Sequence, residues 1–239
     1  MPILNTLTPA EVSELGAELA GLGAGAQTME QVANSTVLHL YDNLVDNTGA
    51  RSLALVRFYK THPYGELDSD LQEFARGILG GPPPSDNVNC LTMLATMGEN
   101  PDWTDRLKSQ GHRAIPFASS EMVASIPMIS RLLSQFGVDV QHALRDRSQN
   151  TELANKRFGV FHVREAQGSE YIPGQDDFVT PYGVKSVLAF GGVLSAGDLF
   201  VTIMFSKTPI SDDVAQSFEP LGPKVKEAID PFARGRIFN

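Results

Sequence analysis

The first part of the chain carries two stretches in which apolar residues recur at helical spacing. The first begins at TPAE, where Thr8 precedes a proline and is followed three residues later by Glu11, and it ends at the glycine-rich sequence GLGAGA. The second runs over residues 28–44 and ends at DNTGA. We therefore expect two amphipathic helices near the N-terminus.

Further along, stretches rich in β-branched and aromatic residues predict strands. The last two, SVLAFGGVL and LFVTIMFSK, flank the turn sequence SAGD and predict a β-hairpin. The expected strands are residues 52–60, 90–96, 158–164, 184–190 and 199–205. We expect all five to share one sheet that is mainly antiparallel.

Helical spacing returns in two places. Residues 119–136 carry one apolar face, and Pro127 within it predicts a kink or a break. A last helix begins at Ser211 and reaches Ile229, with Pro220 and Pro223 predicted to interrupt it. Few strands are joined by helical crossovers, so the order of elements predicts an α+β protein, with helices packed on an antiparallel sheet.

Composition and charge exclude some classes of binding partner. The chain has 239 residues, of which 42% are hydrophobic, so it is long enough to bury a large core. Its net charge of -9 argues against a nucleic-acid partner and against an acidic membrane surface. No apolar run is long enough to span a membrane, and the first residues do not resemble a signal peptide. We expect a soluble, cytoplasmic protein.

Two long stretches resemble the two ends of a GAF domain. EQVANSTVLHLYDNLVDNTGARSLALVRFY resembles the opening helix and first strand of that family. TPYGVKSVLAFGGVLSAGDLFVTIMFSKTPISDDVAQSFEPLGPKVKEAI resembles its closing strands and final helix. The resemblance implies a GAF/PAS-like fold, with six antiparallel strands, helices packed on one face and a small-molecule pocket on the other. We expect an N-terminal helical segment at 1–27, a GAF-like domain at 28–230 and a C-terminal tail at 231–239.

The chain departs from the better-known GAF subclasses. It lacks the Asn-Lys-x-x-Phe signature of cyclic-nucleotide binding, and its one cysteine, Cys90, lies too early to resemble the cysteine that attaches a bilin. Its overall order resembles the sensory region upstream of bacterial histidine kinases. The resemblance therefore implies bacterial signal transduction, a homodimer, and a histidine kinase or another signalling protein as partner.

No recognised catalytic motif is present in the sequence. It contains no G-x-S-x-G elbow, Walker loop, dinucleotide fingerprint or H-E-x-x-H pair, so we expect no catalysis and no catalytic residues. A single cysteine excludes an internal disulfide and any multi-thiolate metal site. The five histidines include no pair at helical spacing, so we expect no metal site and name no cofactor.

The resemblance places residues 101–136 and 168–182 over the pocket. Trp103, the only tryptophan, is interpreted either as an anchor that pins its loop to the core or as a wall of the pocket. His112 lies in a long polar loop and is interpreted either as a solvent-facing residue or as a haem ligand. The candidate ligand-binding residues are Trp103, His112, Met122, Ile126, Met128, Tyr171 and Phe178.

The function predicted from these observations is a sensory or regulatory domain that binds a small, mostly apolar molecule without catalysis of its own. Three alternatives stay open. The first is a gas, redox or light sensor that binds haem or another chromophore. The second is a protein-interaction module with no ligand, and the third is an enzyme of unrecognised type. The helical stripes at the two ends of the chain are predicted to pack together and to form the contact of a homodimer.

Overall fold

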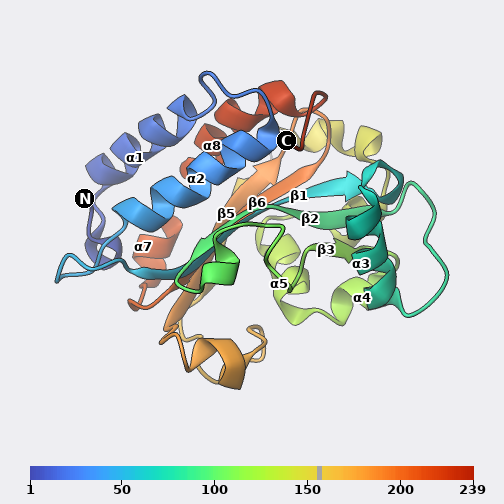
Figure 1. Ribbon diagram of the computed structural model, residues 1–239. Coiled ribbons are helices and arrows are strands. Elements are labelled where there is room, and N and C mark those ends of the chain that lie inside the picture. Colours follow the sequence, from blue (N-terminus) through green and yellow to red (C-terminus); the bar gives the residue numbers. More distant parts are fainter. Residues whose placement is uncertain (155–157) are drawn as a thin grey trace.

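The computed structural model describes residues 1–154 and 158–239, and its centre is one antiparallel sheet of six strands (Figure 1). The strands lie in the order β3-β2-β1-β6-β5-β4. All five predicted strands belong to this sheet, which confirms the α+β architecture built on one mainly antiparallel sheet that was expected from the sequence. Their bounds are β1 (Leu53–Pro63), β2 (Asn89–Gly98), β3 (Ala114–Pro116), β4 (Phe158–Val163), β5 (Ser186–Val193) and β6 (Leu199–Ser206).

The predicted hairpin is β5–β6, and its register runs from Ser186 opposite Ser206 to Val193 opposite Leu199. Gly197 in the turn adopts φ +90°, in the left-handed region that favours glycine. A Cβ at this position would lie 1.8 Å from the carbonyl oxygen of Arg147, so the turn packs tightly against that segment. The turn therefore depends on glycine both for its conformation and for its contact.

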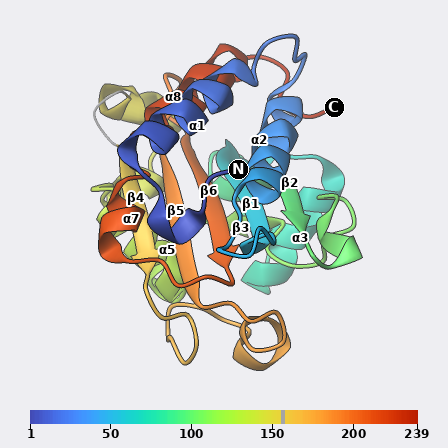
Figure 2. The same cartoon turned by 90° about the vertical axis from the view of Figure 1, so that its left-hand side faces the viewer.

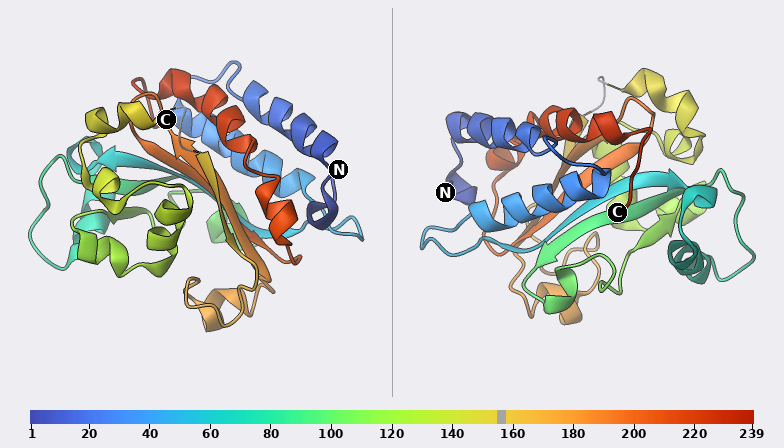
Figure 3. Two further views of the ribbon diagram at one scale, coloured as in Figure 1. Left: turned by 180° about the vertical axis from the view of Figure 1, so that it is seen from behind. Right: turned by 45° about the horizontal axis from the view of Figure 1, so that its top comes forward.

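One face of the sheet is covered by helices from both ends of the chain (Figures 1 and 3). These are α1 (Pro9–Gly21), α2 (Met29–Asn43) and α8 (Leu221–Ile229), while the short α7 (Asp212–Gln216) lies beside β4. The predicted capping box is present, because Thr8 accepts from the backbone of Glu11 while the Glu11 carboxylate accepts from the Thr8 backbone. Helix α1 packs against α8, so the terminal helices contact each other as predicted.

The other face is covered by three further helices: α4 (Ser120–Ala124), α5 (Pro127–Gln135) and α6 (Val140–Leu144) (Figure 3). Pro127 breaks the predicted helix into α4 and α5, and Ile126 between them has non-helical backbone angles, φ -113° and ψ 89°. Helices therefore lie on both faces, where the resemblance placed them on one. The reason is physical, since the sheet has an apolar second face and residues 119–136 have an apolar face to bury.

Helix α3 (Ser69–Leu79) lies at the edge of the sheet beside β3 and forms a small core of its own. The predicted last helix is interrupted before Leu221, giving α7 and α8. The loop between β4 and β5 forms a π-helical turn, Gln175–Val179 (orange in Figure 2). It lies at the end of the sheet away from α8 (Figure 2). This loop packs onto the second face of the sheet.

An ion pair in the interior joins β1 to the β5–β6 turn. The Lys60 ammonium lies 2.9 Å from an Asp198 carboxylate oxygen, and both side chains are 0% exposed. Burial lowers the pKa of Lys60 and raises the pKa of Asp198, and in each case the charge of the partner opposes the shift. Removing one partner from such a pair leaves a buried charge without compensation.

We expect Asp198→Asn, which keeps the shape and removes the charge, to lower the free energy of unfolding by about 3 kcal/mol. The matched control is Glu227→Gln on α8, whose carboxylate forms an exposed ion pair with Lys224 at 3.3 Å. That change should cost about 0.5 kcal/mol or less. Urea denaturation of both variants measures the difference. Equal decreases in the free energy of unfolding would show that the buried pair stabilises the fold no more than the exposed one does.

Candidate functional site

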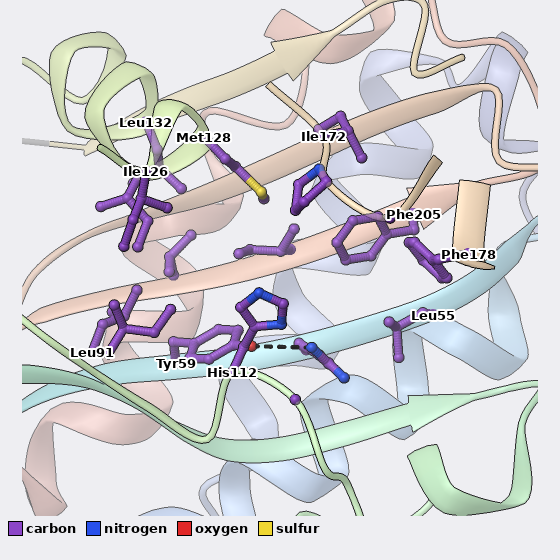
Figure 4. A pocket seen from close by; sticks show the side chains of 18 of the residues that line it. Leu55, Tyr59, Leu91, His112, Ile126, Met128, Leu132, Ile172, Phe178 and Phe205 are labelled. Atoms are coloured by element: carbon purple, nitrogen blue, oxygen red, sulfur yellow. Dashed lines mark hydrogen bonds between the residues drawn. The ribbon is translucent and has the colours of Figure 1, made fainter. Parts of the chain in front are cut away.

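A cavity of about 330 Å³ lies between the second face of the sheet and its cover (Figure 4). Its floor is formed by β1 and β6, and its roof by the break between α4 and α5 together with the loops before β3 and after β4. Because side chains alternate along a strand, every second residue of β1 faces it, namely Leu55, Arg57 and Tyr59. Val201, Ile203 and Phe205 do the same on β6.

The roof is apolar and depends on the proline break. Ile126 and Met128 flank Pro127, and Figure 4 shows both, with Leu132, on the same side of the cavity. The interruption between α4 and α5 exposes these side chains to the space below instead of burying them in a continuous helix–sheet contact. A roof with a flexible methionine adapts its shape more readily than one of branched side chains.

Aromatic rings close one end. The Trp103 ring meets Phe178 edge-on at 5.4 Å between centroids and Tyr182 at 4.6 Å, and Phe178 meets Phe205 at 5.0 Å. Tyr182 also accepts a hydrogen bond from Asn100 at 3.0 Å. Trp103 therefore anchors its loop and also lines the cavity, so the two interpretations of this residue hold together.

The polar groups gather around Arg57 on the floor. Arg57 is 8% exposed, and one terminal nitrogen of its guanidinium donates to Ser109 Oγ at 3.1 Å. The other lies 3.5 Å from the Tyr59 hydroxyl, the contact dashed in Figure 4. Arg57 Nε has no hydrogen-bond partner among the described residues. A buried cation thus lies at the surface of an otherwise apolar space.

His112 lies at the mouth of the cavity, in front of Tyr59 in Figure 4. It is the one non-glycine residue with a positive φ, 59°, in the part of the chain that the structure describes. Its side chain is exposed, yet loss of surrounding water lowers its pKa, and the positive charge of Arg57 lowers this pKa further. The imidazole is therefore neutral near pH 7.

Five of the seven predicted residues line this cavity: Trp103, His112, Ile126, Met128 and Phe178. Met122 is not among the lining residues, because the short α4 buries Val123 instead. Tyr171 also lies outside the lining, and its ring packs under the guanidinium of Arg131 on α5 at 4.2 Å. It ties the loop to the roof.

Arg57 and Tyr59 were missed by the sequence analysis. Both lie in the predicted strand 52–60, and the signal that pointed to them was a single charged residue within the apolar run LALVRFY. A charge in the middle of a strand that is buried along its length requires a polar surrounding, which pattern alone does not identify.

The only cysteine lies apart from the cavity. Cys90 on β2 is buried in the small core beside α3, whereas its neighbour Leu91 lines the cavity. Burial raises the pKa of the Cys90 thiol to about 12, so its thiolate is not available at neutral pH. Over residues 1–154 and 158–239, no group of three metal-ligating side chains is placed to hold a metal ion.

Comparisons with known proteins give a fold and no family. No family model and no curated protein matches the chain. Among solved structures, the free methionine-R-sulfoxide reductase of Neisseria meningitidis, in complex with its substrate, is similar over 96% of this chain and 94% of its own, with a TM-score of 0.51 and 10% identity. A GAF domain from a phosphoenolpyruvate-protein phosphotransferase of Coxiella burnetii is similar over 94% and 95%, with a TM-score of 0.47 and 9% identity.

The first of these likenesses corrects one expectation. The sequence contains no familiar catalytic motif, and a domain without catalysis is expected on that ground. The reductase shares the fold over nearly its whole length and is an enzyme, which contradicts that prediction. The lack of a known motif therefore does not exclude catalysis in a chain of this fold. Separately, none of the described helices has the length and hydropathy to cross a membrane.

A glycine controls the loop that closes the aromatic end. Gly174 lines the cavity with φ +72°, and its carbonyl accepts from the backbone of Phe178 at 2.8 Å. We expect Gly174→Ala to strain this turn by about 1–2 kcal/mol and to shift Trp103 fluorescence, because Phe178 packs on Trp103. Thermal unfolding and the emission spectrum measure the two effects.

Gly77→Ala on α3 is the control, since a Cβ there meets nothing within 4 Å in a helix interior. This change should stabilise the protein by about 0.5–1 kcal/mol and leave the Trp103 emission unchanged. If the two variants gave the same emission spectrum, the loop would not be held against Trp103 in the way described.

Proposed function

We propose that the protein binds a small, mostly apolar molecule in this cavity. The observation that carries the proposal is an apolar space of about 330 Å³ whose few polar groups converge near Arg57. Ligand sites are concave, mostly apolar, and carry a small number of placed polar groups that orient the ligand. The packed floor and the aromatic end leave this volume unfilled, so it is available to a ligand.

The role that we infer is sensory or regulatory, in bacterial signal transduction. The roof and the loop after β4 contact each other through Arg131 and Tyr171, and the loop contacts the aromatic end through Phe178. A molecule that fills the cavity touches all these segments at once and favours the arrangement in which they close on it. The protein would then pass this change to another signalling protein, such as a histidine kinase. It would do so as a homodimer.

Two specific chemistries receive no support from the site. Reduction of a sulfoxide by a thiol needs a thiolate beside the bound substrate, and Cys90 is outside the cavity with a raised pKa. Attachment of a bilin through a cysteine fails for the same reason. A haem held by His112 remains the chromophore alternative, and a visible absorption spectrum of the purified protein identifies it.

The test is to fill the cavity. Ile203→Phe adds a ring to the floor, and we expect it to weaken the binding of any compound that stabilises the wild type by at least about tenfold. Compounds are found by screening metabolites for a higher melting temperature together with a change in Trp103 fluorescence. Ile78→Phe, the same change at an exposed position on α3, should bind as the wild type does.

A compound that binds Ile203→Phe as tightly as the wild type occupies another site. If every stabilising compound behaved in this way and left Trp103 fluorescence unchanged, the proposal would be wrong.

The position of His112 favours a second candidate, a reaction on the bound molecule. A backbone in a strained conformation is maintained at functional sites, and a neutral imidazole at the mouth of a pocket is suited to proton transfer. In this case we expect His112→Gln to retain the affinity for the compound and to lose its conversion. Mass spectrometry of the incubated compound measures conversion, and unchanged product with His112→Gln would remove the candidate.

A further inference from the structure

Arg57 is a buried charge without a counter-charge. It lies in the middle of β1 with 8% of its surface exposed, and no carboxylate is within ion-pair distance among residues 1–154 and 158–239. Its protein partners are two hydroxyl groups, of which Tyr59 is distant at 3.5 Å. A guanidinium has five N–H donors, so most of those on Arg57, including Nε–H, have no acceptor from the described protein.

Two other cations with little exposure have carboxylate partners. Lys60, three residues further along the same strand, lies 2.9 Å from Asp198, and Arg106 donates to Glu30 at 2.7 Å. A buried charge costs several kcal/mol unless it is paired and hydrogen-bonded. These two cations have carboxylate partners, whereas Arg57, which faces the cavity, has none among the described residues.

The rest of the lining shows what accompanies this charge. Asp102 is the one carboxylate in the lining, and it lies exposed at the rim rather than beside Arg57. His112, the second basic group, is neutral near pH 7. Nearly all remaining contacts are aliphatic or aromatic. The part of the floor around Arg57 is therefore suited to an anion, and the rest of the cavity to an apolar body.

We propose that the ligand is an amphipathic organic acid, whose carboxylate binds Arg57 and whose apolar body lies beneath Ile126 and Met128. The inference rests on the proposed function, because it names the class of molecule that the cavity binds. Guanidinium and carboxylate are matched in geometry and form two parallel hydrogen bonds, which the free donors of Arg57 allow. A neutral or cationic molecule of the same shape leaves these donors without acceptors and adds, if cationic, a like charge.

The experiment compares molecules that differ only in the head group: octanoate, octanol and octylamine. We expect octanoate to bind about ten- to a hundredfold more tightly than octanol, and octylamine to bind most weakly. Isothermal titration calorimetry measures the three affinities. A second set, 4-phenylbutyrate and 4-phenylbutylamine, shows whether the cavity takes an aliphatic or an aromatic acid.

Arg57→Met replaces the guanidinium with an apolar side chain of similar length and so removes the charge. We expect it to lose the preference for octanoate over octanol while octanol still binds, which separates loss of the anchor from loss of the fold. Arg57→Lys keeps the charge without the planar fork and should retain part of the preference. Arg76→Met on α3, at an exposed position outside the cavity lining, is the matched control and should bind octanoate as the wild type does.

The outcomes separate the two claims. If octanol and octanoate bind equally and Ile203→Phe weakens both, the cavity binds ligands but the acid is not selected, and this inference is wrong. The same holds if Arg57→Met retains the preference. If none of the five compounds binds the wild type at millimolar concentration, or if binding is unaffected by Ile203→Phe, the proposed function fails with it.

Discussion

The structure depends on a sheet whose two faces are both apolar and must both be covered. Strands β1, β2, β5 and β6 are buried along almost their whole length, so water cannot remain on either side. The helices α1, α2 and α8 cover one face closely (Figure 3). The other face is covered by α4, α5, α6 and loops, and this cover is interrupted at Pro127, above β1 and β6. The cavity is the result of that difference.

The buried cations differ between the two faces of the sheet in the same way. On the closely packed side, Lys60 has a carboxylate partner and contributes to holding the β5–β6 turn. On the side of the cavity, Arg57 has hydroxyl partners and donors to spare. A protein that buries a charge without pairing it loses stability, and such losses are found where function requires them. The site therefore has an unfilled volume and a cation without a carboxylate partner. A bound anionic molecule would fill the first and pair with the second.

The sequence predicted the parts of this account that depend on local pattern. The five long strands, the capping box at Thr8 and the interruption at Pro127 all follow from residue type and spacing. Strand β3 was not predicted, because its three residues, Ala114–Pro116, are too few to show a period. Arg57 was not predicted as a site residue. Its role depends on the absence of a carboxylate partner from distant segments, which sequence pattern does not reveal. Met122 was placed at the site by its position on a helical stripe and Tyr171 by its position in a loop, whereas the direction of each side chain is set by packing.

The central claim is that an acid-binding cavity lies between the sheet and the α4–α5 cover. The most direct measurement is a crystal structure of the protein grown with octanoate. We expect electron density for the ligand in this cavity, with its carboxylate against the guanidinium of Arg57 and its chain beneath Ile126 and Met128. A structure in which the α4–α5 segment has closed onto β6 and fills the space with its own side chains would contradict the account.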